Sequence, residues 1–158
     1  MGDVSEKDFT ESLFVLLKET FEGPPPATAS AYLDQGGGLF QTVEALTAEQ
    51  ASRAAGAGAP TIAAHCAHAK FYLDVLHGYM QGSDESADWK QSWLVREVGA
   101  EEWESLKSEM RASYETLTKT LRSVGAWGER SVGGAMAVIA HTAYHLGAVR
   151  QLARAVKS

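Results

Sequence analysis

The chain has 158 residues, 45% hydrophobic and 22% charged, which excludes disorder of the whole chain and suits one domain over residues 1–158. The net charge is −6 with scattered Lys and Arg, which argues against nucleic-acid binding. The single cysteine, Cys66, excludes an intrachain disulfide and fits a reducing compartment. The polar N-terminus lacks a signal-peptide pattern, and the longest strongly apolar stretch, near residues 135–140, is too short to span a bilayer. We therefore expect a cytoplasmic protein with no membrane partner.

The first half of the chain is predicted to be helical, because its apolar residues recur at three- and four-residue steps and no run alternates with period two. A first long helix is expected over residues 5–21, ending before Gly23 and three prolines. An irregular connection over residues 27–38 precedes a short helix over 39–46. Thr47 and Gln50 then form a capping-box pattern that opens another helical turn.

Three further long helices are predicted in the second half, over residues 62–80, 100–124 and 131–155. Thr61 is the expected N-cap of the first of these. Residues 88–95 are a candidate short helix, and Trp89 and Trp93 within it are expected to pack in the core, cap the bundle or form a dimer surface. Four long amphipathic helices with irregular links predict an all-α fold, a four-helix bundle with short extra helices in the connections.

Four of the five histidines lie in pairs on two predicted helices. His141 and His145 share one helix face and continue an apolar stripe that should face the interior. Buried imidazoles are costly without partners, and one metal ion would supply a partner to both. His68, two turns after the N-cap of its helix, could complete a three-imidazole site with positions left for water or substrate. The alternative is a set of hydrogen-bonded core histidines.

Other residues near these pairs have weaker assignments. His65, three residues before His68, is expected to contact one of the metal-binding histidines without binding the ion itself, or to lie at the rim of the site. Tyr72, four residues after His68, is the candidate catalytic side chain, against the alternative of a core aromatic residue. Tyr144 is expected to face a neighbouring helix. Cys66 is interpreted as a small buried residue.

Two further expectations concern residues outside the pairs. His77 is placed at the surface near a helix end, where it would offset the helix dipole. Imidazole ligands usually donate their outer N–H to an acceptor, and Asp34, Glu44 and Asp74 are candidates for that role.

The segments around both pairs, residues 60–69 and 141–147, resemble the DinB-like (YfiT-like) superfamily of four-helix-bundle proteins. In that family a histidine lies about two turns after a Ser/Thr N-cap, and the last helix carries His-x-x-x-His, commonly followed by glycine. The register from Thr61 selects His68, rather than His65, as the third ligand. The resemblance implies one divalent ion, zinc or nickel, held by His68, His141 and His145, and also implies a homodimer.

Three functions remain open from the sequence. Some members of the resembling family use small cellular thiols, which favours a metal-dependent thiol transferase with a low-molecular-weight thiol as cosubstrate; a hydrolase acting on a small molecule fits the residues equally well. The alternative is a non-catalytic metal-binding or stress-response bundle. The third possibility is a helical interaction protein without a metal.

Overall fold

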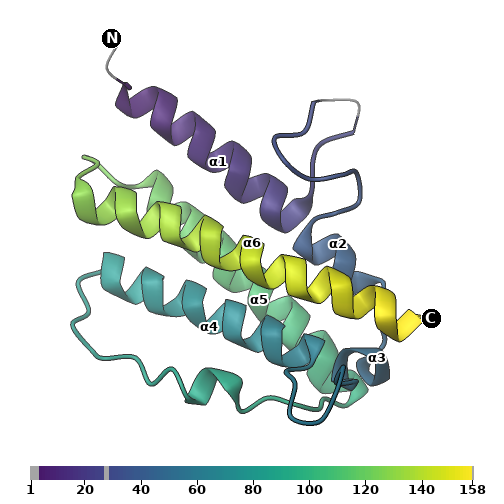
Figure 1. The fold of residues 1–158 in the computed structure, drawn as a ribbon. Helices are drawn as coiled ribbons and strands as arrows, with labels where there is room; N and C mark the ends of the chain where they lie inside the picture. Colours follow the sequence, from purple (N-terminus) through teal and green to yellow (C-terminus); the bar gives the residue numbers. More distant parts are fainter. Residues whose placement is uncertain (1–3, 27–28, 158) are drawn as a thin grey trace.

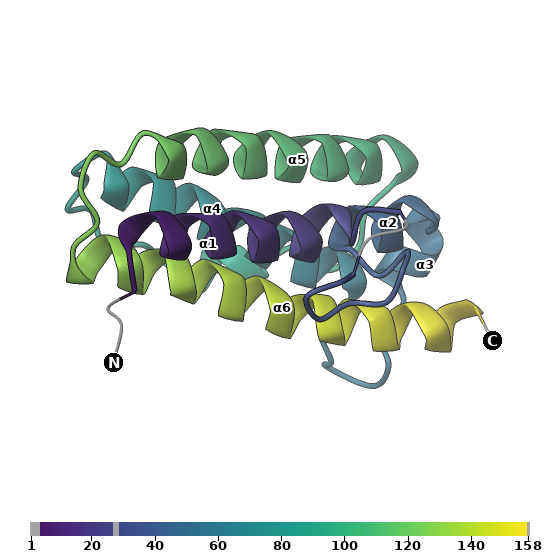
Figure 2. The ribbon, with the colours of Figure 1, turned by 90° about the horizontal axis from the view of Figure 1, so that it is seen from above.

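The computed structural model describes residues 4–26 and 29–157, and within these ranges the chain forms helices and no strand. The connection predicted over 27–38 therefore begins with two residues outside the described ranges. Figure 1 shows α6 between α1 and α4, and Figure 2 shows α5 and α6 on opposite sides of the bundle. The predicted all-α four-helix bundle with short extra helices is confirmed. The elements are α1 (Glu6–Glu22), α2 (Leu39–Glu44), α3 (Ala48–Ser52), α4 (Ile62–Met80), the 3-10 helix η1 (Gln91–Trp93), α5 (Ala100–Arg122) and α6 (Glu129–Lys157).

The starts of α1, α3 and α4 follow from capping side chains. Ser5 accepts a hydrogen bond from the N–H of Asp8 at 3.1 Å, and Thr61 accepts one from the N–H of Ala64, also at 3.1 Å. Thr47 and Gln50 form the predicted capping box of α3. Accordingly α1 and α4 cover nearly the predicted residues, whereas α2 ends two residues early and α6 extends two residues beyond the prediction at each end. Of residues 88–95, only η1 is helical.

An apolar stripe on α5 forms one wall of the core. All six of its residues are buried, and the largest, Trp103, also donates its indole N–H to the carbonyl of Leu46 at 3.0 Å. On α4 and α6 the buried stripes include Leu73 and Val138, which are fully enclosed. The six residues of this stripe are Trp103, Leu106, Met110, Tyr114, Leu117 and Leu121.

A buried carboxylate fastens the connection between α1 and α2. Glu19, only 3% exposed, accepts hydrogen bonds from the backbone N–H groups of Ala31, Tyr32 and Leu33 at 2.7, 2.7 and 2.6 Å. Burial raises the pKa of Glu19, but the three backbone hydrogen bonds lower it by more, so that its pKa lies below the ordinary 4.5. The charged group is therefore satisfied entirely by the main chain of the loop.

The last helix differs from one expectation. By length and composition α6 could cross a bilayer, whereas the sequence predicts no apolar stretch of that length. The core helix of a soluble protein passes the same test. In this structure α6 packs against α1 and α4, with eight buried residues along its length.

Candidate metal centre

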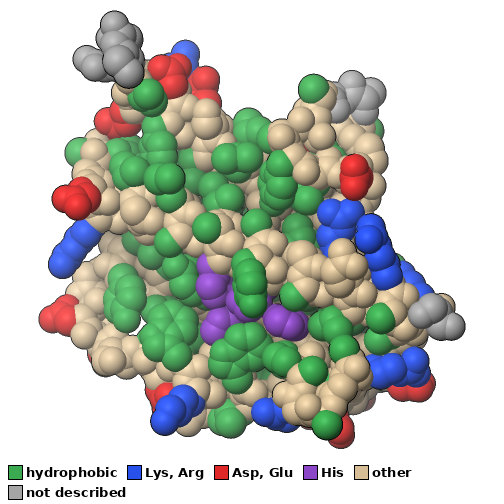
Figure 3. All heavy atoms as spheres, in the orientation of Figure 1, with side chains coloured by type: hydrophobic (Ala, Val, Ile, Leu, Met, Phe, Trp, Pro, Cys, Tyr) green, Lys and Arg blue, Asp and Glu red, His purple; other side chains and the backbone are tan. Residues whose placement is uncertain are grey.

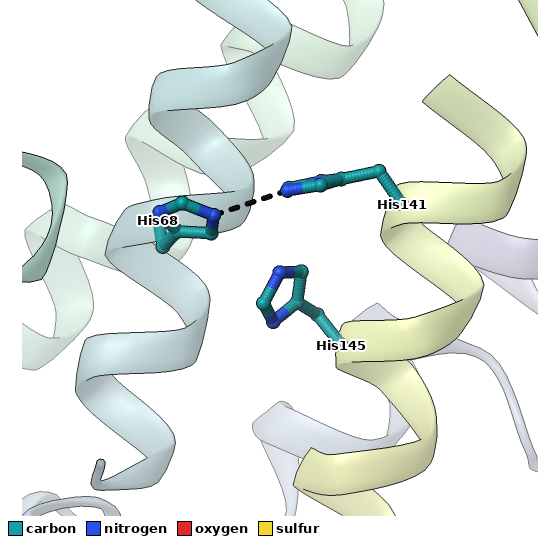
Figure 4. Close-up of side chains that lie close together, drawn as sticks. All are labelled: His68, His141 and His145. Carbon is teal, nitrogen blue, oxygen red and sulfur yellow. Dashed lines mark hydrogen bonds between the residues drawn. The ribbon is translucent and has the colours of Figure 1, made fainter. Parts of the chain in front are cut away.

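The first half of α4 and the middle of α6 lie side by side and bring the predicted ligands together. Figure 4 shows His68 reaching from α4 toward His141 and His145 on α6. One nitrogen from each of these three rings lies within 4.8 Å of the other two, so the three histidines could hold a metal ion. His68 and His145 are buried and His141 is half-buried.

The spacing of the nitrogens suits a small divalent ion. The Nε2 atoms of His68 and His141 are 3.0 Å apart. With bonds of about 2.0–2.1 Å to a tetrahedral zinc ion, two ligand nitrogens are separated by about 3.3 Å. In Figure 4 one nitrogen of His145 is turned toward this pair and the other away from it. One nitrogen of each ring therefore faces a common space that could hold an ion.

The outer nitrogens of the three rings have different surroundings. His68 Nδ1 lies 2.7 Å from the hydroxyl of Ser92, and His145 Nδ1 lies 2.9 Å from Nδ1 of His65. His141 Nδ1 is buried with no hydrogen-bond partner among the described residues. His65 thus lies behind His145, on the side away from the other two rings, while Ser92 lies behind His68.

Burial keeps the four imidazoles neutral. Burial, and to a smaller extent the neighbouring imidazoles, lower the pKa of His145 to about 3 and that of His141 to about 4. Burial also lowers the pKa of His65. The pKa of His68 is lowered by burial and, to a smaller extent, by the nearby imidazole of His65. Within the described residues no carboxylate forms a hydrogen bond or ion pair with these rings. Neutral imidazole is the form that binds a metal.

Aromatic side chains enclose the rings. Trp93 stacks on His68 with centroids 4.1 Å apart and planes at 19°, and Tyr72 stacks on His141 at 3.8 Å and 15°. The expectation that Tyr144 faces a neighbouring helix is wrong, because it is 72% exposed, with its ring edge-on to His145 at 5.0 Å. Figure 3 shows the histidines reaching the surface among hydrophobic side chains, with acidic and basic groups farther out.

The structure corrects the prediction for His77 and confirms the one for Cys66. His77 is half-buried rather than at the surface, and its Nδ1 lies 2.9 Å from the hydroxyl of Thr120 on α5. Cys66 is buried as expected, and burial raises its thiol pKa to about 12, so it is not an available thiolate.

The carboxylates considered as acceptors for the imidazoles form ion pairs elsewhere. Asp34 pairs with Arg150 at 3.4 Å, Glu44 with Lys107 at 3.7 Å, and Asp74 with Lys70 at 3.0 Å. Those three candidate roles were wrong. Because η1 lies in a connection without periodicity, no pattern in the sequence could have selected Ser92 in their place.

A wide cavity lies away from the histidines. It has a volume of about 820 Å³ and is formed by the end of α4 and the turn after it, by Val124 just beyond α5, and by the start of α6. Leu76, Tyr79 and Arg130 are among its lining residues, and none of the four clustered histidines is. This cavity therefore does not supply a substrate pocket for the histidine site.

Comparison with known proteins supports the resemblance seen in the sequence. A family model described as the DinB superfamily matches residues 32–149, more than half of the chain. Neither the curated proteins nor the solved structures give a match. The matched segment contains α2 to α5 and all four clustered histidines. The chain belongs to the DinB superfamily.

Proposed function

We propose that His68, His141 and His145 bind one divalent ion, zinc or nickel, and that the protein is an enzyme acting on a small molecule. The observation that carries the proposal is the meeting of three neutral, largely buried imidazoles from two helices. Such a donor set suits zinc, nickel and other borderline ions. Three side-chain ligands leave further positions for water or substrate.

The charge of the site favours an anionic reactant. Three neutral ligands leave the charge of a divalent ion uncompensated, and no carboxylate of the described residues pairs with the rings. When bound, the ion supplies Lewis acidity, which favours the deprotonated form of a thiol or a water molecule. We favour a low-molecular-weight thiol as cosubstrate, with hydrolysis as the second reaction class.

The chain's own residues have separate tasks in this proposal. The three histidines fix the position of the reacting group, and Trp93 and Tyr72 exclude water from two sides. In a thiol transfer the S–H proton passes to solvent, a carbon–sulfur bond forms, and the leaving group departs with its electron pair. The Tyr72 hydroxyl is the side-chain group proposed to contact substrate or bound water. A cytoplasmic location and a homodimer complete the proposal.

The test is a thiol-dependent reaction that requires the ion. The protein reconstituted with zinc or nickel is mixed with a small thiol and a chromogenic electrophile, and conjugate formation is followed. We expect turnover that a chelator abolishes and added metal restores. His145→Ala should remove it, whereas His77→Ala, at a histidine outside the cluster, should retain it.

The alternative outcomes of this assay are distinct. Bound metal without turnover for any thiol, ester or amide substrate would favour the non-catalytic metal-binding bundle. Equal turnover by wild type and His145→Ala would contradict the proposed site altogether.

A further inference from the structure

We propose that Ser92 is a positioning residue, which fixes the proton of His68 on Nδ1 and thereby directs the Nε2 lone pair toward His141 and His145. The metal-binding consequence rests on the proposed function. The assignment of the proton does not, because it follows from hydrogen bonds present in the protein alone.

The hydrogen atoms available to Ser92 determine which nitrogen of His68 carries the proton. The Ser92 hydroxyl lies 2.7 Å from the main-chain carbonyl of Trp89 and 2.7 Å from Nδ1 of His68. A carbonyl cannot donate, so the single hydroxyl hydrogen of Ser92 goes to Trp89. Ser92 can then only accept from His68, which requires a hydrogen on Nδ1. In neutral His68 the other nitrogen, Nε2, is left with a free lone pair.

This arrangement agrees with the opposite edge of the ring. His68 Nε2 lies 3.0 Å from His141 Nε2, so one of these two nitrogens must carry a hydrogen. With the lone pair on His68, His141 is the donor, and its Nδ1 becomes an acceptor. A buried nitrogen without a partner, as Nδ1 of His141 is, is less costly as a bare acceptor than as an N–H donor.

The segment that carries Ser92 is anchored independently of the histidines. The Thr61 hydroxyl donates to the carbonyl of Arg96 at 2.8 Å, and the N–H of Val98 donates to the Ser52 hydroxyl at 2.9 Å. Trp93, the next residue after Ser92, stacks flat on His68. One short segment therefore holds the His68 ring in the metal-free protein, with Ser92 at its Nδ1 and Trp93 against its face.

The chain contains a second histidine that contacts a hydroxyl bound to a main-chain carbonyl, outside the cluster, and this pair serves as a control. His77 Nδ1 lies 2.9 Å from the Thr120 hydroxyl, which donates to the carbonyl of Thr116 at 3.2 Å. Thr120 is 8% exposed and Ser92 is 4% exposed, so the two hydroxyls are similarly buried. Replacing Thr120 removes the same kind of hydrogen bond from a histidine that is not a candidate ligand.

The first measurement is the tautomer of His68 in the metal-free protein, read from the ¹⁵N shifts and two-bond ring couplings of its imidazole. We expect Nδ1–H in the wild type and in Ser92→Thr, which keeps the hydroxyl. In Ser92→Ala we expect the Nε2–H form to become populated. Wild-type His68 with its proton on Nε2, or an unchanged tautomer in Ser92→Ala, would overturn the proposal.

The second measurement is zinc affinity by competition with a chromophoric chelator. Loss of an outer hydrogen bond to an imidazole ligand should weaken binding about 10–100-fold in Ser92→Ala. Thr120→Val should bind zinc as the wild type does, and equal affinity in Ser92→Ala would contradict a positioning role. If wild type shows Nδ1–H but binds no zinc, the hydrogen-bond assignment is supported and the proposed function is the part that fails.

Discussion

Two of the regions in which the described residues bury polar groups, Glu19 and the histidine cluster, are satisfied differently. The carboxylate of Glu19 accepts three backbone N–H groups of one loop, so the charge is fully paired within the fold. The histidine cluster has four imidazoles that mostly contact one another, and Nδ1 of His141 has no hydrogen-bond partner among residues 4–26 and 29–157. A buried group whose hydrogen bonds are complete stabilises the fold, whereas a converging, incompletely paired set indicates a site for something else to bind.

The largest expected effect on stability comes from replacing Glu19. Glu19→Ala should lower the free energy of unfolding by about 3 kcal/mol, because three backbone donors lose a charged acceptor. Glu19→Gln keeps one acceptor oxygen and should cost less. Chemical denaturation measures both. The stabilisation by added zinc should be unchanged, and a variant that loses it would show that the two regions are coupled.

Replacing a histidine of the cluster should instead affect the stabilisation by zinc more than the stability of the metal-free protein. Zinc at a hundred times its Kd should stabilise the wild type by about 2.7 kcal/mol, because the ion binds the folded state. His141→Ala should lose that gain while its metal-free stability changes far less. Denaturation with and without zinc tests this, with His77→Ala as the control. A retained zinc response in His141→Ala would exclude His141 as a ligand.

Acid should separate the two regions by pH. The histidine pKa values are lowered from 6.5, to about 4 for His141 and about 3 for His145. As the pH falls, these histidines therefore take up protons in the unfolded chain before they do so in the folded protein. Their contribution to the free energy of unfolding is present above pH 6.5 and is lost as the pH falls toward 3. The pKa of Glu19 is also lowered, from 4.5, so its contribution is lost only at lower pH, beginning below about 4.5.

Denaturation of the metal-free protein between pH 8 and pH 3 measures these windows. His145→Gln should flatten the loss of stability between pH 6.5 and 4.5, and Glu19→Gln should flatten the loss below pH 4.5. A loss of equal slope in His145→Gln and wild type would contradict the assignment of the upper window.

The smallest effect on metal binding is expected at Tyr72. Tyr72→Phe keeps the ring that stacks on His141, so zinc affinity should change by less than about twofold. Turnover with a small thiol should fall if the hydroxyl contacts the substrate. A Phe variant with full turnover would leave Tyr72 as a packing residue only.

Helical periodicity was sufficient to predict the four long helices and to place His141 and His145 on one helix face. The choice of His68 as the third ligand depended on the family resemblance, through the register from Thr61 to His68, and the structure brings the three rings together. The same periodicity misplaced Tyr144, because a residue next to a buried one can point to solvent as well as toward a neighbouring helix.

The surroundings of the cluster could not be predicted from the sequence. Ser92 and Trp93 lie in a connection without a repeating pattern, and their position depends on tertiary hydrogen bonds at Thr61 and Ser52. The carboxylates chosen as outer partners, such as Asp74, had nearer cations on their own or adjacent elements. Pairing between distant segments is decided by packing, which spacing along the chain does not reveal.

The most direct test of the central claim is the metal content of the purified protein after reconstitution with zinc or nickel, measured by elemental analysis. We expect close to one ion per chain in the wild type and almost none when His68, His141 and His145 are all replaced by alanine. No stoichiometric ion in the reconstituted wild type, or equal content in the triple variant, would contradict the account.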